Sequence, residues 1–309
     1  MKVVFKVFRG NSSKNRHDEF DMEVSKGMTI MDCLNELKSH CDSSIAHRCG
    51  CNNGICGICT VKANGKPCLA CKTNAMDAAN EGNEITLEPL DRFPVIRDLV
   101  SDMGPFFDDN LKMKPWLEER KGAPEHENII PQKMNDRIGS ASDCIMCGAC
   151  HSACIVLDQE KRFAGPASMV TAKRYMEDTR DAIRKERMKI CNDTHSAWDC
   201  THCLYCNEVC PVGIKPLGCI SDVRMRLIIE GQGSRGATHH KAFLNSIEGS
   251  GILDESKYPI FAIGMNPFRL KEIIPVGFRM IKTGKAPDIM HKPIDKLGEV
   301  RKLFKEVKE

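Results

Sequence analysis

Residues 144–154 read CIMCGACHSAC, and residues 200–211 read CTHCLYCNEVCP. In both runs the cysteines are separated by two, two and three residues. This spacing is typical of the bacterial run that binds [4Fe–4S] clusters, in which the first three cysteines hold one cluster and the fourth ligates the other. The two runs therefore predict one domain with two clusters, in which each run supplies ligands to both.

The predicted ligand sets cross between the two runs. The first [4Fe–4S] cluster is expected on Cys144, Cys147, Cys150 and Cys210, and the second on Cys154, Cys200, Cys203 and Cys206. A zinc site or a set of disulfides would not require two runs of matched spacing, so both are poorer interpretations of this pattern.

A third group of cysteines comes earlier in the chain, where residues 49–59 read CGCNNGICGIC. Cys51, Cys56 and Cys59 with a distant fourth cysteine have the plant-type [2Fe–2S] spacing. Glycines at 54 and 57 would let backbone amides turn toward the sulfurs without obstruction by a Cβ. The expected ligands are Cys51, Cys56, Cys59 and Cys71. Cys49 and Cys68 each lie close to a ligand in the sequence and remain alternatives.

The predicted ligands use twelve of the eighteen cysteines. Free cysteine is most often a small buried hydrophobic residue, so the other six are assigned no role. They are Cys33, Cys41, Cys49, Cys68, Cys191 and Cys219.

Length and composition narrow the function classes. A chain of 309 residues predicts two domains. A net charge of +3 with 6% aromatic residues gives no basic stacking surface, so no nucleic-acid partner is expected. No stretch approaches the ~20 apolar residues of a membrane span, and the N-terminus has no signal-peptide pattern, so a soluble or peripheral protein is expected. Residues 269–309 hold eleven Lys or Arg against six Asp or Glu, which makes this tail +5.

The first hundred residues carry strand and helix signals. Apolar residues alternate around a turn signal near the N-terminus, which predicts a strand–loop–strand hairpin. Thr29 and Asp32 have capping-box spacing before a helix expected to run to about His40. Strands are expected at 60–63 and 85–88, with a turn at Asn64-Gly65.

Beyond Pro94 the pattern predicts helices, at about 166–179, 216–230 and 236–247. The predicted fold class is α+β: an N-terminal β-grasp [2Fe–2S] ferredoxin domain followed by an all-α dicluster domain. The expected limits are 1–105 for the ferredoxin domain, 106–137 for a connecting segment, 138–250 for the helical domain and 251–309 for a basic tail that docks on a partner or a membrane.

About residues 1–250 resemble the iron–sulfur subunit of succinate dehydrogenase and fumarate reductase. Besides the cysteines, the segments that carry the resemblance are FPVIRDLV at 93–100, Asp102-Met103, Lys114-Pro115-Trp116, Gly165-Pro166-Ala167, and CPVGIKP at 210–216.

The resemblance implies a chain that holds one [2Fe–2S] and two [4Fe–4S] clusters and binds no substrate. It would pass single electrons between a flavoprotein subunit, which interconverts succinate and fumarate at FAD, and a membrane anchor subunit linked to the quinone pool. The expected location is peripheral to the inner (plasma) membrane on the cytoplasmic face, with the periplasmic face as the alternative if the chain is exported together with the flavoprotein. The sequence gives neither the direction of the reaction nor the quinone.

The sequence departs from the family pattern around the third cluster. Most of the family has [3Fe–4S] there because the position of Cys203 is not cysteine, so this chain is expected to belong to a variant type with [4Fe–4S], and [3Fe–4S] is the alternative. The family tryptophan after Cys154 is missing, and the family histidine after Cys200 is displaced to His202. His202 is a candidate quinone contact, and an unusual anchor subunit, which could itself contain iron and sulfur, is expected.

Two other functions are compatible with these motifs. Clusters do not identify the electron donor, so the chain could serve another flavin dehydrogenase or a thiol-linked fumarate reductase. A cysteine-rich zinc module is the alternative from another class, and it would be colourless and free of iron.

Overall fold

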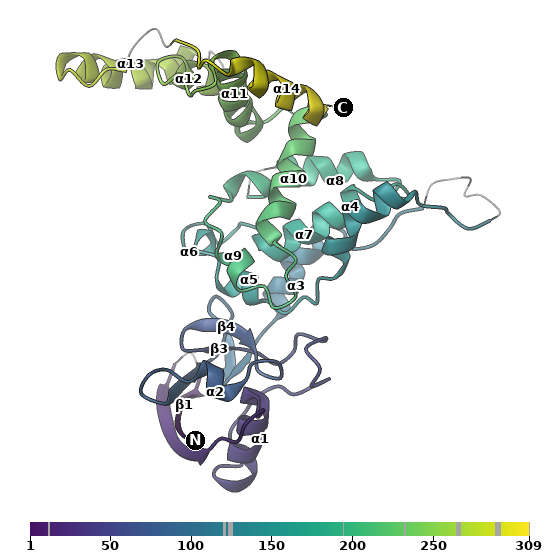
Figure 1. Ribbon diagram of the computed structural model, residues 1–309, viewed down its shortest axis with the longest axis vertical. Coiled ribbons are helices and arrows are strands. Elements are labelled where there is room, and N and C mark those ends of the chain that lie inside the picture. The colour runs from purple at the N-terminus through teal and green to yellow at the C-terminus, as the bar shows by residue number, and fades with distance from the viewer. Residues whose placement is uncertain are drawn as a thin grey trace. The chain divides into compact units, whose positions relative to one another are not determined.

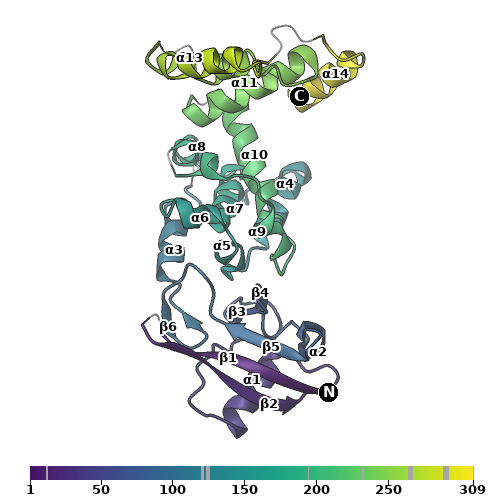
Figure 2. The same cartoon turned by 90° about the vertical axis from the view of Figure 1, so that its left-hand side faces the viewer.

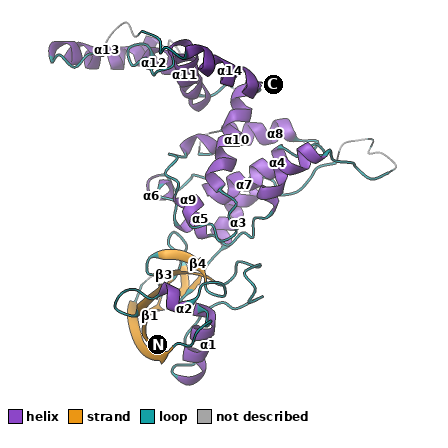
Figure 3. Cartoon of the chain, viewed as in Figure 1, coloured by secondary structure: helices purple, strands orange, loops and turns teal. Residues whose placement is uncertain are grey.

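The computed structural model describes residues 1–11, 13–119, 122, 126–193, 195–231, 233–263, 267–287 and 292–308. The chain forms two compact units, Met1–Val223 and Arg224–Glu309. Figure 3 shows the strands in the N-terminal part of the chain and helices in the rest, which confirms the predicted α+β class. The four segment limits expected from the sequence remain predictions.

Five strands form one sheet in the order β2-β1-β5-β3-β4 (Figures 1 and 2). β1 is antiparallel to β2 and parallel to β5, while β3 is antiparallel to both β5 and β4. The bounds are β1 Lys2–Gly10, β2 Asn15–Glu23, β3 Thr60–Ala63, β4 Lys66–Leu69 and β5 Glu84–Glu88. In β1, Val3, Phe5 and Val7 are fully buried and alternate with more exposed residues, as a strand with one face on a core requires.

The Asn64-Gly65 turn is confirmed, but it leads into β4, a strand that the sequence pattern did not predict. Asn64 has φ 49° and Gly65 has φ 77°. Positive φ at both central residues is the type I′ geometry, whose twist matches that of the two flanking strands. The turn therefore fixes the β3–β4 register, which places Cys68 opposite Val61.

The helix α1, Ile30–His40, begins at the predicted capping box. The Thr29 side chain accepts from the backbone N–H of Asp32, and the Asp32 carboxylate accepts from the backbone N–H of Thr29. The apolar face of α1 is part of a core of nineteen buried residues that also includes side chains of the sheet. This core makes the ferredoxin-like part a rigid support for the cysteine loop that follows.

A buried aspartate anchors the chain just before the cysteine loop. Asp98 is 2% exposed and accepts from the backbone N–H groups of Gly10 at 2.8 Å and Ala46 at 2.9 Å. Its carboxylate also lies 3.4 Å from the guanidinium of Arg9, which is buried too. These contacts tie the segment that enters the loop to strand β1.

The expectation of helix directly after Pro94 is wrong. Residues Val95–Arg97 form β6 and pair with β7, Val100–Ser101, around Asp98, whose φ of 50° turns the chain back. The β6–β7 pair forms in place of a helix because Asp98 is held by hydrogen bonds to residues far away in the sequence. A local sequence pattern cannot show such contacts.

From Gly104 onward every regular element of the described residues is a helix. The segment 106–137, expected to connect the two domains, contains most of α3 and the first part of α4. Phe106 of α3 packs with Leu90, Phe93 and Ala167. The helices that complete this unit are α2 Ala75–Ala78, α3 Gly104–Leu111, α4 Gln132–Ser142, α5 Ala149–Ser152, α6 Val156–Gln159, α7 Gly165–Met176, α8 Arg184–Asn192, η1 Ala197–Asp199 and α9 Tyr205–Glu208.

The ferredoxin-like part and the helical part of the first unit are joined by named contacts. The backbone N–H of Asp91 donates to the Ser152 hydroxyl at 2.9 Å, and the Arg92 guanidinium donates to the Ser152 carbonyl and pairs with Asp158. Lys72 donates to the carbonyl of Pro211 at 3.1 Å. Ser152 and Pro211 each lie close to a predicted ligand, so these contacts hold the cysteine runs against the ferredoxin-like part.

The helix α10, Pro216–Ile229, contains the boundary between the units. The second unit continues with α11 Arg235–Ser250, α12 Tyr258–Ile263, α13 Pro267–Lys282 and α14 Leu297–Lys308. Within it α11 packs against α12 and α14, and α12 has contacts with α13. The helices predicted at about 166–179, 216–230 and 236–247 correspond to α7, α10 and α11, which confirms them.

Candidate metal centres

The loop 49–59 directs backbone amides at the first predicted ligand. The N–H groups of Asn53, Ile55 and Cys56 donate to the sulfur of Cys51 at 3.4, 3.4 and 3.3 Å. These hydrogen bonds lower the pKa of Cys51 to about 6, and the one from Asn53 has the largest effect. A thiolate is the form that binds metal, so the loop prepares Cys51 as a ligand.

The fourth cysteine of this site is identified by its neighbours. The sulfur of Cys71 lies 3.3 Å from that of Cys59 and accepts from the backbone N–H of Gly54 at 3.3 Å. Burial raises the pKa of Cys59 to about 12, and a hydrogen bond with the backbone of Cys71 offsets only part of this cost. The structure thus brings Cys71 to the other predicted ligands.

The two alternatives have other surroundings. Cys49 is exposed and its thiol donates to the Asn52 side chain at 3.3 Å. Cys68 lies in β4, where burial raises its pKa. Neither sulfur has a recorded contact with the sulfur of Cys59 or Cys71.

The four cysteines expected to hold the first [4Fe–4S] cluster line one cavity. Apolar residues, Val170 and Ile214 among them, complete its walls, and the lining cysteines are Cys144, Cys147, Cys150 and Cys210. Burial and, after it, the neighbouring thiols Cys147 and Cys144 raise the pKa of Cys150 well above its ordinary value. Cys210 comes from the other run, so the predicted crossing is present in the geometry.

The second set is also brought together. Cys154 and Cys200 share an apolar cluster with Val156, Leu157 and Phe163. Burial raises the pKa of Cys206 to about 12, and the neighbouring thiols of Cys200, Cys154 and Cys203 raise it further. The Cys206 thiol therefore interacts electrostatically with each of the other three predicted ligands.

The two runs have the same backbone conformation, 56 residues apart. The residues on either side of the second cysteine are left-handed in both: Met146 and Gly148 have φ 52° and 79°, and His202 and Leu204 have φ 59° and 71°. A four-residue helix follows in each case, α5 in the first run and α9 in the second. Cys203 therefore occupies the same local position as Cys147.

All twelve predicted ligands are cysteines, the residue type that holds iron–sulfur clusters. Within the residues that the structure describes, no three His, Cys, Asp or Glu side chains are grouped as around one metal ion. An iron–sulfur cluster has several irons and its own sulfides, so its protein ligands surround an inorganic core. The twelve predicted ligands lie in three groups, each partly lined by apolar residues or by backbone amides.

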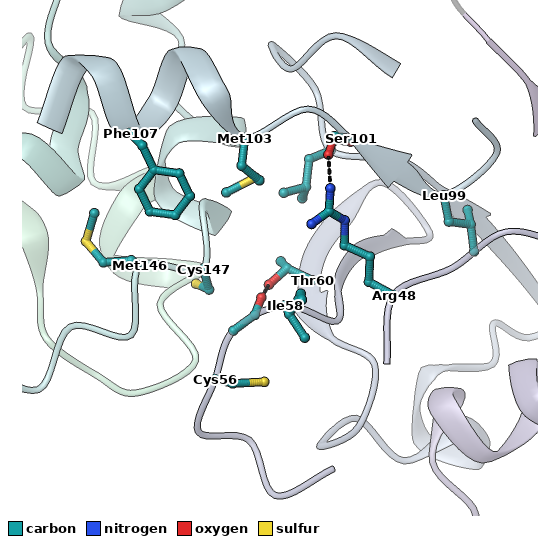
Figure 4. A pocket seen from close by; sticks show the side chains of 12 residues that line it. Arg48, Cys56, Ile58, Thr60, Leu99, Ser101, Met103, Phe107, Met146 and Cys147 are labelled. Atoms are coloured by element: carbon teal, nitrogen blue, oxygen red, sulfur yellow. Dashed lines mark hydrogen bonds between the residues drawn. The ribbon is translucent and has the colours of Figure 1, made fainter. Parts of the chain in front are cut away.

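A close approach of two loops connects the first two sets (Figure 4). A Cβ added to Gly57 would lie 2.8 Å from the Cβ of Cys147 and 2.9 Å from the Ile145 carbonyl oxygen, so only glycine allows this contact. Cys56, Cys147, Met146 and Phe107 line the same hollow in Figure 4. The sequence suggested Gly57 only as a residue that turns amides toward sulfur; its contact with the second loop depends on tertiary packing.

The second and third sets adjoin through α5 and α9, which pack together. The thiol of Cys206 is among the groups that raise the pKa of Cys150. The three sets therefore follow one another in space: the loop 51–59, then the set around Cys147 and Cys150, then the set around Cys206.

His151, directly after Cys150, is a buried residue that sequence reasoning missed. Its ring lies 5.0 Å from that of Phe93 and 5.5 Å from that of Phe106. Burial lowers its pKa to about 4, so the ring is neutral near pH 7 and packs as an aromatic residue. Its place beside a predicted ligand was the only signal in the sequence.

The candidate quinone contact, His202, is exposed and lies between Cys200 and Cys203 with φ 59°. Its role remains a prediction.

Four of the six unassigned cysteines are buried or partly buried. Three of them are Cys33, Cys191 and Cys219, and burial raises their pKa values to about 11, 12 and 11. Among the described helices, none has the length and apolar character needed to cross a membrane.

Comparison with known proteins agrees with this arrangement. Residues 4–108 match the 2Fe-2S iron-sulfur cluster binding domain, and residues 140–214 match the 4Fe-4S dicluster domain. The fumarate reductase iron-sulfur subunit of Escherichia coli O6:H1 is 35% identical over 202 residues, which are 65% of this chain and 82% of that protein. The succinate dehydrogenase iron-sulfur subunit of Coxiella burnetii is 30% identical over 235 residues, 74% of this chain and 98% of that protein.

A solved structure shares the fold as well. A chain of the Mycobacterium smegmatis Sdh1 complex in the apo form superposes with a TM-score of 0.69 at 26% identity and covers 75% of this chain and 98% of its own. The chain belongs to the iron–sulfur subunits of the succinate dehydrogenase and fumarate reductase family, and it is the iron–sulfur electron relay of such an oxidoreductase complex.

Proposed function

We propose that this subunit relays electrons through three clusters in the order [2Fe–2S], first [4Fe–4S], second [4Fe–4S]. Clusters of these types accept and donate single electrons when bound. The observation that carries the proposal is the succession of the three cysteine sets, with Gly57 against Cys147 at one junction and α5 against α9 at the other. Electron transfer slows steeply with distance, so such close junctions are what a relay needs.

The ligands in this proposal are the twelve cysteines in their three sets. The [2Fe–2S] ligands are Cys51, Cys56, Cys59 and Cys71; the first [4Fe–4S] ligands are Cys144, Cys147, Cys150 and Cys210; the second [4Fe–4S] ligands are Cys154, Cys200, Cys203 and Cys206. The matching backbone of the two runs supports [4Fe–4S] rather than [3Fe–4S] in the last set, because Cys203 occupies the position that Cys147 has in the first run.

Both ends of the relay carry exposed apolar side chains. In the [2Fe–2S] loop Ile55 is 66% and Ile58 is 42% exposed. At the other end Ile155, Leu204 and Tyr205 are 42%, 51% and 47% exposed beside the second-set cysteines. Apolar side chains at such positions are typical of protein interfaces. We infer that an FAD-containing flavoprotein docks at the first end and the membrane anchor subunit at the second.

The remaining parts of the proposal follow from this arrangement. The chain is peripheral to the inner (plasma) membrane on its cytoplasmic face, with the periplasmic face as the alternative, and the anchor subunit connects it to the quinone pool. His202, between Cys200 and Cys203, is the residue nearest in sequence to the second set that could contact a quinone. Copurification with an FAD-containing succinate dehydrogenase would support this function, and a different flavoprotein partner would favour the other-dehydrogenase alternative.

The nature of the last cluster is tested by EPR spectroscopy of the protein purified without oxygen. In the wild type we expect two [4Fe–4S] signals after reduction and no stoichiometric [3Fe–4S] signal in the oxidised state. Cys203→Ser should convert one cluster to [3Fe–4S], which is detected in the oxidised sample. Cys219→Ser is the matched control, since Cys219 is buried beside Cys144 and Cys210 but belongs to no ligand set.

Three results would contradict the assignment. A stoichiometric [3Fe–4S] signal in the intact wild type would mean that Cys203 is not a ligand. Unchanged spectra in the Cys203→Ser protein, with full iron content, would mean the same. Loss of a cluster in Cys219→Ser would show that the ligand sets themselves are wrong.

A further inference from the structure

The helix α13, Pro267–Lys282, presents large apolar side chains to solvent. Ile274, Phe278 and Ile281 are 53%, 69% and 67% exposed, and Val276 and Met280 are 44% and 37% exposed. Figure 1 shows α13 extending beyond α11 and α12, the helices of the same unit that precede it. A surface helix of a monomer normally buries such residues, so this apolar face is one that a partner covers.

Three of these exposed residues lie on one side of the helix. With 100° between successive residues, Ile274, Phe278 and Ile281 have the i, i+4, i+7 relation of a single stripe. Val276 and Met280 lie about 160° from Phe278, at the far edge of an apolar arc that Ile273 connects to this stripe. Lys271 and Lys282 lie about 20° and 40° to the other side of Phe278, and Arg279 lies about 100° from it on that same side. α13 is thus amphipathic, with a wide apolar face and a narrow cationic one.

The charge of this helix identifies the partner. Residues 267–285 contain five Lys or Arg and one acidic residue, Glu272. Lys271, Arg279, Lys282 and Lys285 are exposed, and none of them forms an ion pair with another residue that the structure describes. Lysine is depleted in the cores of protein interfaces, whereas anionic lipid headgroups attract a cationic helix face. Long Lys and Arg side chains can also lie along an apolar surface while their charges reach the headgroups.

We propose that α13 lies in the surface of a membrane that contains anionic lipid, with Phe278, Ile274 and Ile281 among the acyl chains. Sixteen residues of helix extend about 24 Å, which is shorter than the ~30 Å hydrocarbon core, so a flat orientation fits and a spanning one does not. Pro275 has no backbone N–H, so the carbonyl of Lys271 lacks its usual hydrogen-bond donor within the helix. Both residues lie on the cationic side of the helix, where water or lipid headgroups can donate a hydrogen bond to that carbonyl.

This anchor is an addition to the relay function and does not depend on it. It would hold the subunit at the bilayer through its own sequence, beside any contact with an anchor subunit. If α13 did not bind lipid, the cluster assignments and the relay would be unaffected.

The test uses the full chain with its clusters and sedimentation with vesicles. One set of vesicles is phosphatidylcholine, and the other contains phosphatidylglycerol as well. The wild type should bind the anionic vesicles more tightly, and binding should weaken as salt is added. Phe278→Asp should weaken binding by about tenfold or more, because a large apolar contact is lost. Ile129→Asp is its control, since Ile129 is 85% exposed but lies outside this unit.

The charges are tested by a second matched pair. The triple variant Lys271→Gln, Arg279→Gln, Lys282→Gln should reduce binding to anionic vesicles by about a hundredfold and leave the weak binding to neutral vesicles unchanged. The control removes three exposed lysines elsewhere: Lys26→Gln, Lys133→Gln, Lys185→Gln. It lowers the net charge equally and should leave most of the binding intact.

A fluorescent variant reports the depth of insertion. The emission of Phe278→Trp, corrected for the two native tryptophans, should shift to the blue on anionic vesicles and be quenched by brominated lipid acyl chains. Equal binding by the Phe278→Asp protein and the wild type would overturn the proposal. The proposal would also be overturned if sedimentation velocity showed that α13 mediates dimerisation while the protein did not bind vesicles. The same holds if the control variant with three lysines replaced elsewhere lost as much vesicle binding as the α13 triple variant.

Discussion

Leu204 has a backbone conformation that leucine avoids. Its φ is 71°, whereas the equivalent residue of the first cysteine run is Gly148, with φ 79°. Left-handed geometry costs a residue with a Cβ about 1 kcal/mol or more, and glycine escapes this cost. The Leu204 side chain is 51% exposed, so burial cannot explain its presence. An exposed leucine in a strained position is better explained by an interface with another protein.

Leu204→Gly should therefore make the subunit more stable and the complex less active. The strain is removed, so the free energy of unfolding of the cluster-loaded protein should rise by about 1 kcal/mol. The apolar contact with the partner is lost, so electron transfer from succinate to the quinone pool in the assembled complex should slow. Denaturant unfolding measures the first effect and succinate:quinone reductase activity the second.

Leu204→Ala separates the two effects. Alanine keeps the Cβ and hence the strain, but it lacks most of the apolar side chain. We expect slower electron transfer without the gain in stability. If both variants keep full activity, Leu204 does not contact the electron partner.

Among the elements, those with strong local signals were predictable. The capping box at Thr29 begins α1 because two backbone donors are satisfied within four residues. Asn64-Gly65 specifies its turn because both residues accept positive φ. The spacing of the cysteine runs is an equally strong local signal, since a cluster constrains the spacing of its ligands more strictly than packing constrains apolar residues.

Other elements depend on tertiary contacts that no local pattern reveals. The helices α3 and α4 have no side chain that caps their first residue, and α5 and α9 are one turn each. Such short helices are unstable alone and persist because of what surrounds them. The contact between Gly57 and Cys147 likewise arises only when two distant loops meet.

Gly57→Ala tests that contact between the loops. The new Cβ would lie 2.8 Å from Cys147 Cβ and 2.9 Å from Cys147 Cα, so the loops must separate. We expect weaker magnetic coupling between the [2Fe–2S] cluster and its neighbour in EPR spectra of the reduced protein, and slower reduction of the second and third clusters. The loss of stability should exceed the ~1 kcal/mol of left-handed strain alone.

Gly65→Ala is the control for strain. Gly65 has φ 77° against 72° for Gly57, but a Cβ at residue 65 would meet nothing within 4 Å. It should cost about 1 kcal/mol and leave the magnetic coupling unchanged. Equal coupling in the Gly57→Ala protein and the wild type would show that this contact does not set the distance between the clusters.

At the scale of the first unit, the two parts depend on their clusters to different degrees. The sheet and α1 share a core of nineteen buried residues; Cys59 is among them, and the partly buried Cys71 and Cys147 pack against it. In the helical part, three apolar clusters include proposed ligands: Cys150 in one, Cys144 and Cys210 in another, and Cys154 and Cys200 in the third. The helical part therefore has its packing built around the metal centres.

Removal of iron should accordingly unfold the helical part before the sheet. Without iron, the eight cysteines of the two runs no longer tie segments more than fifty residues apart, and α5 and α9 are too short to persist alone. Hydrogen exchange measured before and after chelation should show amides of α5, α7 and α9 losing protection, while those of β1 and β5 change by less than about tenfold. Equal loss in both parts would mean that the sheet also requires the clusters, and that the whole unit folds around iron.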